Sequence, residues 1–134
     1  MESSLDHVQV NVRAANMAFY TELMTFLGWQ TIFGDENFAG MGGANGGSLW
    51  FVATDHDAPS DYDSPGHNHV GIGVTRQEDV DAVIGYLGGR NVETLFETPR
   101  HRDIPGKDGH TSYQVMFESA DGVLFEVQYS GPKS

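Results

Sequence analysis

Residues 5–12 read LDHVQVNV and residues 67–74 read HNHVGIGV, so the chain carries the same short pattern twice. When the two stretches are aligned, His7 falls on His69 and three β-branched residues fall on three others. Aliphatic residues alternate with polar residues or glycines in both stretches, which is typical of a strand with one buried face. The repeat predicts two copies of one supersecondary unit.

A helical pattern follows each copy. Apolar residues recur there at spacings of three and four; they are Met17, Tyr20, Leu23, Met24 and Leu27 in the first half and Val80, Val83, Ile84 and Leu87 in the second. Such spacing places one apolar stripe along a helix. Residues 75–78, Thr-Arg-Gln-Glu, match the capping box that marks a helix start.

Three strand-like segments follow each predicted helix. We expect them at about 30–33, 38–41 and 48–53 in the first half, and at about 92–97, 112–118 and 123–129 in the second. Asn45-Gly46 and Asp121-Gly122 fall at matching places, and both dipeptides favour tight hairpins. This alignment also sets Trp50 at the position of Glu126. Each half is therefore predicted to be a βαβββ module.

The predicted fold class is α+β, with two βαβββ modules forming a cupped mixed β-sheet. We expect a single domain over residues 1–134, with module one at about 5–54, a linker at 55–66 and module two at about 67–130. The linker is rich in aspartate and proline but lacks the glycine and terminal glutamate of an EF-hand, so it is interpreted as solvated chain rather than as a calcium loop.

One face of each central strand is apolar, and the other carries histidine, glutamate, glutamine and glycine. The valine-rich faces are expected to pack on the helices. Glycine on the opposite faces leaves space, as a ligand cavity requires. The polar faces are therefore expected to line a cup.

Composition excludes several classes of protein. The 134 residues include 7 Lys and Arg against 19 Asp and Glu, which gives a net charge of -12 and disfavours nucleic-acid binding. The absence of cysteine excludes disulfides, thiolate metal sites and a cysteine nucleophile. No apolar run is long enough for a signal sequence or a membrane span. We expect a cytoplasmic protein.

The paired modules, each opening with a His-Val strand, resemble the vicinal oxygen chelate superfamily, which includes glyoxalase I, extradiol dioxygenases, and bleomycin and fosfomycin resistance proteins. Residues 117–127, FESADGVLFEV, are similar to the usual end of these proteins, in which Asp-Gly precedes an aliphatic or aromatic residue and a glutamate. The resemblance implies a homodimer that acts on a small molecule with vicinal or chelating oxygens, by extradiol-type cleavage or by lyase or isomerase chemistry.

The resemblance also implies a metal site. Its ligands here would be His7, His69 and Glu126, while Trp50 occupies the fourth position and cannot coordinate, which departs from the glyoxalase I pattern. Imidazole and carboxylate ligands suit Fe(II), Mn(II), Ni(II), Co(II) or Zn(II). Three ligands would leave positions open for a bidentate substrate.

The second half is longer between its second and third strands, at Thr98–Thr111. This insertion is interpreted either as a lid that recognises a carboxylate or phenolate and supplies an acid or base, or as a solvated loop that neutralises nearby acids. The candidate catalytic residues are His101, His110 and Tyr113. The candidate substrate-binding residues are Trp50, Gln9, His67, Gln128, Arg100 and Arg102.

A second function stays open at this point. Bleomycin resistance proteins trap cationic drugs without catalysis, and the charge of -12 and Trp50 in place of a fourth ligand fit such a binding protein. The presence or absence of a stoichiometric metal ion separates the two hypotheses.

Overall fold

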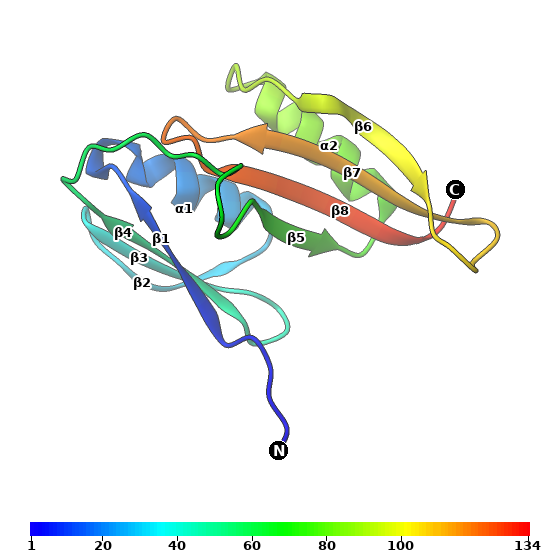
Figure 1. Ribbon diagram of the computed structural model, residues 1–134, viewed down its shortest axis with the longest axis horizontal. Coiled ribbons are helices and arrows are strands. Elements are labelled where there is room, and N and C mark those ends of the chain that lie inside the picture. Colours follow the sequence, from blue (N-terminus) through cyan, green and yellow to red (C-terminus); the bar gives the residue numbers. More distant parts are fainter. The chain divides into compact units, whose positions relative to one another are not determined.

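The computed structural model describes residues 1–134, which divide into two compact units, Met1–Ala58 and Pro59–Ser134. Unit 1 contains β1 (His7–Val12), a 3-10 turn (Ala14–Asn16), α1 (Met17–Phe26), β2 (Gln30–Gly34), β3 (Phe38–Gly42) and β4 (Ser48–Ala53). Unit 2 contains β5 (Val70–Val74), α2 (Gln77–Gly88), β6 (Leu95–Asp103), β7 (His110–Glu118) and β8 (Leu124–Pro132). Both units are thus βαβββ modules, as the repeat predicted (Figure 1).

Each unit builds one four-stranded mixed sheet with the same strand order. The orders are β1-β4-β3-β2 and β5-β8-β7-β6, and in each unit the first strand pairs in parallel with the last. Trp50 pairs with Gln9, and Glu126 pairs with Gly71, two residues beyond His7 and His69 respectively. Trp50 and Glu126 therefore occupy equivalent positions in the two sheets, as the alignment predicted.

The predicted apolar stripes bury the helices against their own sheets, and Figure 1 shows each helix crossing one sheet face. In α1, Tyr20, Leu23 and Met24 are fully buried, and the Tyr20 ring stacks on Phe51 of β4 with a centroid distance of 4.7 Å. In α2, the buried side chains are Val80, Val83 and Leu87. Removal of each such side chain from water contributes roughly 1.5–3 kcal/mol, so the apolar stripes stabilise the packing of each helix on its sheet. No helix of the chain has the length and apolar character needed to cross a membrane.

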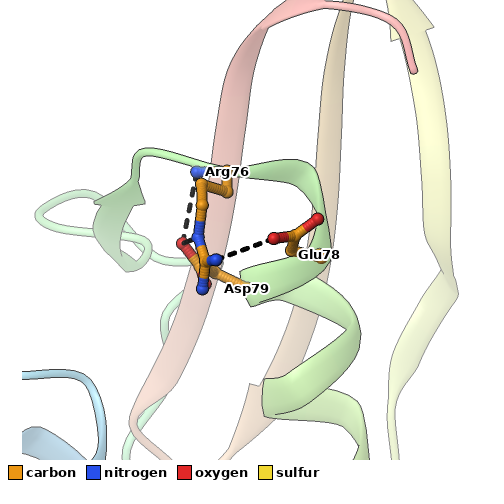
Figure 2. A network of polar contacts seen from close by, with 3 residues as sticks. All are labelled: Arg76, Glu78 and Asp79. Atoms are coloured by element: carbon orange, nitrogen blue, oxygen red, sulfur yellow. Dashed lines mark hydrogen bonds and ion pairs between the residues drawn. The ribbon is translucent and has the colours of Figure 1, made fainter.

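Helix α2 starts one residue later than residues 75–78 predict (Figure 2). Arg76 occupies the N-cap, and the Asp79 carboxylate at N3 accepts its backbone N–H at 3.2 Å and its guanidinium at 2.6 Å. Glu78 instead accepts a second guanidinium N–H at 2.7 Å. Because the N-cap is Arg76 rather than Thr75, Asp79 rather than Glu78 occupies N3, where its carboxylate reaches back to the N-cap N–H.

The segment Thr98–Thr111 is not a loop, which corrects the expectation from sequence. Strand β6 continues to Asp103 and β7 begins at His110, so only the residues between them form the turn. The β6–β7 register shifts between Leu95 and Arg100. Thr98 bridges this bulge, because its hydroxyl donates to the Leu95 carbonyl at 2.6 Å and accepts the Met116 backbone N–H at 2.9 Å.

The strand after the linker is also shorter than the repeat predicts. Strand β5 begins at Val70, so the residues from His67 to His69 precede the ladder. The Asn68 side-chain amide donates to the Tyr62 carbonyl at 2.9 Å and contacts His69 through its oxygen. Side-chain bonds of this kind compete with strand pairing.

Candidate metal and ligand site

Strands β5, β7 and β8 present a polar face on the side of their sheet opposite α2. Cross-strand partners share a face, so the pairing of Glu126 with Gly71 and of Gln128 with Gly73 places all four on one side. The alternating residues Phe125 and Val127 are fully buried on the other side. The two-faced strand pattern expected from sequence is present in this unit.

A pocket of about 330 Å³ opens on this face. It is lined by Gly71, Ile72, Gly73, Val74, Glu126, Gln128 and Ser130. A Cβ built at Gly73 would meet no atom within 4 Å, and one built at Gly71 would come no closer than 3.9 Å to the Glu126 carboxylate. Side chains at these two positions would therefore project into open space, and glycine keeps that space free beside the carboxylate.

His69 lies near Glu126, which is one of the residues that line this pocket. The His69 Nε2 atom lies 4.0 Å from Oε2 of Glu126, with side-chain exposures of 36% and 15%. Metal–nitrogen and metal–oxygen bonds are each about 2.0–2.2 Å long, so two ligand atoms in tetrahedral or cis-octahedral positions lie roughly 2.8–3.6 Å apart. The two side chains reach this range when they approach each other by about 0.4–1.2 Å. Imidazole and carboxylate form a donor set that suits the divalent ions named above. The pair therefore fits a metal ion.

The tautomer of His69 is determined by Asn68. The Asn68 amide nitrogen donates to the Tyr62 carbonyl, so its Oδ1 accepts the proton of His69 Nδ1 at 2.8 Å. In this tautomer of the neutral ring, Nε2 carries the lone pair and lies 4.0 Å from Oε2 of Glu126. Metal-binding histidines are commonly oriented by such a bond at the other ring nitrogen. Asn68 was not among the site residues predicted from sequence. His67, which was predicted to bind substrate, is exposed and has no polar partner.

His7 of unit 1 has the same local arrangement. Its Nδ1 donates to the Asp6 carboxylate at 2.7 Å, which leaves Nε2 free at an imidazole that is 56% exposed. In both repeats an Asp or Asn directly precedes the histidine, and that short pattern was the available sequence signal for Asp6 and Asn68. Within neither unit do three or more His, Asp or Glu side chains form a group that could hold a metal ion.

The matching face of unit 1 is aromatic. Trp50 lies over Gly40, where its indole leaves no room for a Cβ, and its Nε1 donates to Ser48 Oγ at 2.9 Å. The ring of Phe38 lies 5.3 Å from that of Trp50 and 5.6 Å from that of Phe33. Trp50 thus supplies an apolar wall where unit 2 has a carboxylate. Gln9 lies beside Trp50 in the register, and its side chain donates to Asn11 at 3.0 Å.

The structure places His101 and Tyr113 on the face of the second sheet that packs against α2. The Tyr113 hydroxyl donates to Asp81 of α2 at 2.6 Å, and the His101 ring stacks on Tyr113 with a centroid distance of 4.3 Å. Burial, reinforced by the bond to Asp81, raises the pKa of Tyr113 to about 12. A phenol with this pKa remains protonated at neutral pH, and this placement does not support a role for either residue beside Glu126.

His110 lies on the pocket side of β7 but far along it. It pairs with Pro132, six residues beyond Glu126 on β8, which corresponds to roughly 20 Å along the strand. Its Nδ1 contacts the Asp108 carbonyl at 3.4 Å. The expected acid or base role at the Glu126 end of the pocket is not supported by this distance.

Arg100 and Arg102 lie on the pocket face. Arg100 pairs with Gln114 and Arg102 with Ser112, while His101 between them pairs with Tyr113. Gln114 in turn pairs with Gln128, so Arg100 and Gln128 belong to one row across the sheet. Both arginines therefore lie on a strand and not on the lid or loop that was expected from sequence.

Comparison with solved structures identifies the fold. A glyoxylase/bleomycin resistance protein/dioxygenase domain from Frankia sp. EAN1pec superimposes with a TM-score of 0.72 at 20% identity, covering 97% of this chain and 99% of that one. A glyoxalase/dioxygenase from Nostoc punctiforme gives 0.70 at 16% identity, with coverages of 97% and 92%. The fosfomycin resistance protein FosX from Listeria monocytogenes, complexed with Mn(II) and a sulfate ion, gives 0.67 at 21% identity, with coverages of 96% and 91%.

These likenesses establish that the chain has the fold of the vicinal oxygen chelate proteins, as the repeat and its motifs predicted. No family model matches the sequence, and no curated protein matches it.

Proposed function

We propose that this protein is a metal-dependent enzyme that acts on a small substrate with vicinal or chelating oxygens, and that His7, His69 and Glu126 are its metal ligands. The observation that carries the proposal is the pairing of His69 Nε2 with the Glu126 carboxylate at 4.0 Å beside the glycine-lined pocket. The Mn(II) bound by FosX, a protein of the same fold, supports the use of a divalent ion.

The third ligand comes from the other unit. His7 presents a free Nε2 in the same local setting as His69, and each unit alone has too few donors for a centre with three ligands. We therefore propose His7 as the third ligand, supplied either by the same chain or by a second chain in a homodimer.

Each residue has a separate task in this proposal. Asp6 and Asn68 hold the imidazoles in the tautomer that coordinates, Gly71 and Gly73 leave room for substrate, and Gln128 offers an amide for a substrate oxygen. A bound divalent ion supplies Lewis-acid polarisation of the chelating oxygens. Ring cleavage of the extradiol type and lyase or isomerase chemistry are the two reaction classes that use such an ion, and a cytoplasmic location would suit either.

The proposal is tested by metal content. The protein, purified after growth with added Mn(II) or Fe(II), should carry one ion per chain by mass spectrometry of the metals, and Glu126→Gln should lose it. His67→Ala is the matched control, because this exposed imidazole lies two residues from His69 and should leave the metal content unchanged. A wild-type protein without stoichiometric metal in both preparations would overturn the proposal.

A second function has one observation in its favour. The contiguous rings of Phe33, Phe38 and Trp50 on an acidic protein of charge -12 would suit capture of a cationic aromatic compound, as in bleomycin resistance proteins. Under this alternative, the metal-free protein binds such compounds, and Trp50→Ala abolishes binding while Glu126→Gln does not.

A further inference from the structure

Two arginines of the edge strand β6 share the face that carries the proposed metal pair. Arg100 faces the same side as Gln114 and Gln128, with which it forms a row across three strands. Arg102 lies in the next row, opposite Ser112. Neighbouring strands are about 4.8 Å apart, so the row spans about 10 Å, and Glu126 lies about 7 Å further along β8. A small substrate can span these distances.

Neither arginine is neutralised by the protein. The chain has 19 acidic residues, and Arg13 and Arg76 both pair with carboxylates, at 2.5 Å and 2.6 Å. Arg100 and Arg102 have no ion pair and no side-chain hydrogen bond. The Nε of Arg100 is buried and has no hydrogen-bond partner.

A buried guanidinium N–H without a hydrogen-bond partner destabilises the folded state. A guanidinium presents its N–H groups in a fork that matches the oxygens of a carboxylate or phosphoryl group. Two arginines on alternate residues of one strand project from the same face and can converge on a single anion.

From these observations we propose that Arg100 and Arg102, with Gln114 and Gln128 as amide neighbours, form an oxyanion-binding subsite of the cup. The substrate accordingly carries a carboxylate or phosphoryl group in addition to its chelating oxygens. The chelating oxygens of the substrate belong to the proposed function, and this part of the inference rests on it. Anion binding by the arginines does not require a metal.

The test uses the full chain in its metal-free form, with inorganic phosphate and acetate as the probes. Titrations are followed by the arginine Nε–H signals in two-dimensional NMR spectra and by calorimetry. We expect saturable binding of at least one probe. Arg100→Gln should weaken this binding about tenfold or more, because it removes a charge-assisted bidentate contact. Phosphate binding without acetate binding would indicate a phosphoryl substrate, and the converse a carboxylate.

Lys107→Gln is the matched control, because it removes the same charge from the turn of the same hairpin. It should change either affinity less than about twofold, since an exposed charge acts only through a screened field. Arg102→Gln provides a second variant at an exposed position that keeps the test valid if Arg100→Gln fails to fold. Absence of saturable binding, or equal losses in Lys107→Gln and the arginine variants, would overturn the proposal.

Two further measurements separate the possible failures. Mn(II) binding is measured in the same variants by electron paramagnetic resonance; retained Mn(II) binding with unchanged phosphate and acetate binding in Arg100→Gln refutes the subsite alone. If Arg100→Gln loses anion binding while the wild-type protein never binds Mn(II), the metal centre alone is refuted. Sedimentation of Arg100→Gln tests whether the arginine instead pairs with a second copy, because a shift to monomer with unchanged anion binding also overturns the subsite.

Discussion

At the scale of the residue, the orientation of His7 and His69 depends on a hydrogen bond to the residue that precedes each of them. Asp6 and Asn68 each accept the Nδ1 proton of the following histidine, at 2.7 Å and 2.8 Å. The sequence repeat identified the two histidines, because a shared position in two strands is visible as periodicity. It did not identify their partners, because a bond between adjacent side chains requires a backbone that leaves the strand ladder, and periodicity does not report that.

The first prediction follows from this bond. Asn68→Ala should weaken Mn(II) binding by about 10–100-fold, because His69 then loses its orientation and its tautomer is no longer fixed. The measurement is a Mn(II) titration by electron paramagnetic resonance. His67→Ala serves as the neighbouring control, and equal Mn(II) affinity in Asn68→Ala and wild type would refute the role given to Asn68.

The tyrosines provide a second prediction at this scale. The hydrogen bond to Glu118 is the main cause that raises the pKa of Tyr62 to about 12, and burial is the main cause for Tyr113, which also reaches about 12. In the unfolded chain a tyrosine has an ordinary pKa of about 10. The higher pKa in the folded state means that folding favours the neutral phenol. The stability that each contributes is fully present below pH 10 and is lost as the pH rises toward 12.

Absorbance at 295 nm should therefore include late ionisations of Tyr62 and Tyr113, near pH 12. Tyr62→Phe should remove one late transition and leave the other. Tyr113→Phe should remove the complementary one. A titration in which all tyrosines ionise together near pH 10 while the protein is still folded would contradict these contacts.

At the scale of the element, apolar periodicity predicted both helices, and two Asn-Gly or Asp-Gly turns located two hairpins. The prediction was wrong at β6, where the extra length of the second half was interpreted as a lid or a solvated loop. Strand β6 is the edge of its sheet, and edge strands tolerate proline and carry charges that deter further pairing. Sequence alone does not distinguish such an edge strand from a loop.

The start of α2 yields the third prediction. Asp79→Ala removes the carboxylate that accepts the Arg76 backbone N–H, and should lower the free energy of unfolding by about 1 kcal/mol. Urea denaturation followed by circular dichroism measures the loss. Glu78→Ala is the matched control, because it breaks only an exposed ion pair and should cost about 0.5 kcal/mol or less. An equal loss in the two variants would show that the cap contributes nothing beyond the ion pair.

At the scale of the whole molecule, the two modules are alike in topology and unlike in chemistry. The first offers His7 and an aromatic wall, and the second offers His69, Glu126 and unpaired arginines. The repeat revealed this division of roles, because Trp50 and Glu126 are equivalent in register. Whether His7 shares an ion with the other two depends on contacts between modules, which the pattern of a single chain does not encode.

Exchange of modules is testable through complementation. Chains with His7→Ala and chains with Glu126→Gln each lose the proposed centre. If the cup is built from two chains, refolding them together should restore about half of the sites in each mixed dimer, because one pairing brings two intact halves together. Metal content of the mixture measures this. Recovery of no sites would assign the complete centre to one chain.

The central claim is that two imidazoles and one carboxylate bind the same ion. Pulsed electron paramagnetic resonance of the Mn(II)-loaded protein counts coordinated imidazoles directly through their nitrogen couplings. We expect two coupled imidazoles in the wild type. His7→Ala and His69→Ala, which lose stoichiometric binding, should each show one coupled imidazole when loaded with excess Mn(II). Mn(II) without imidazole coupling, or with couplings that both substitutions leave unchanged, would contradict the account.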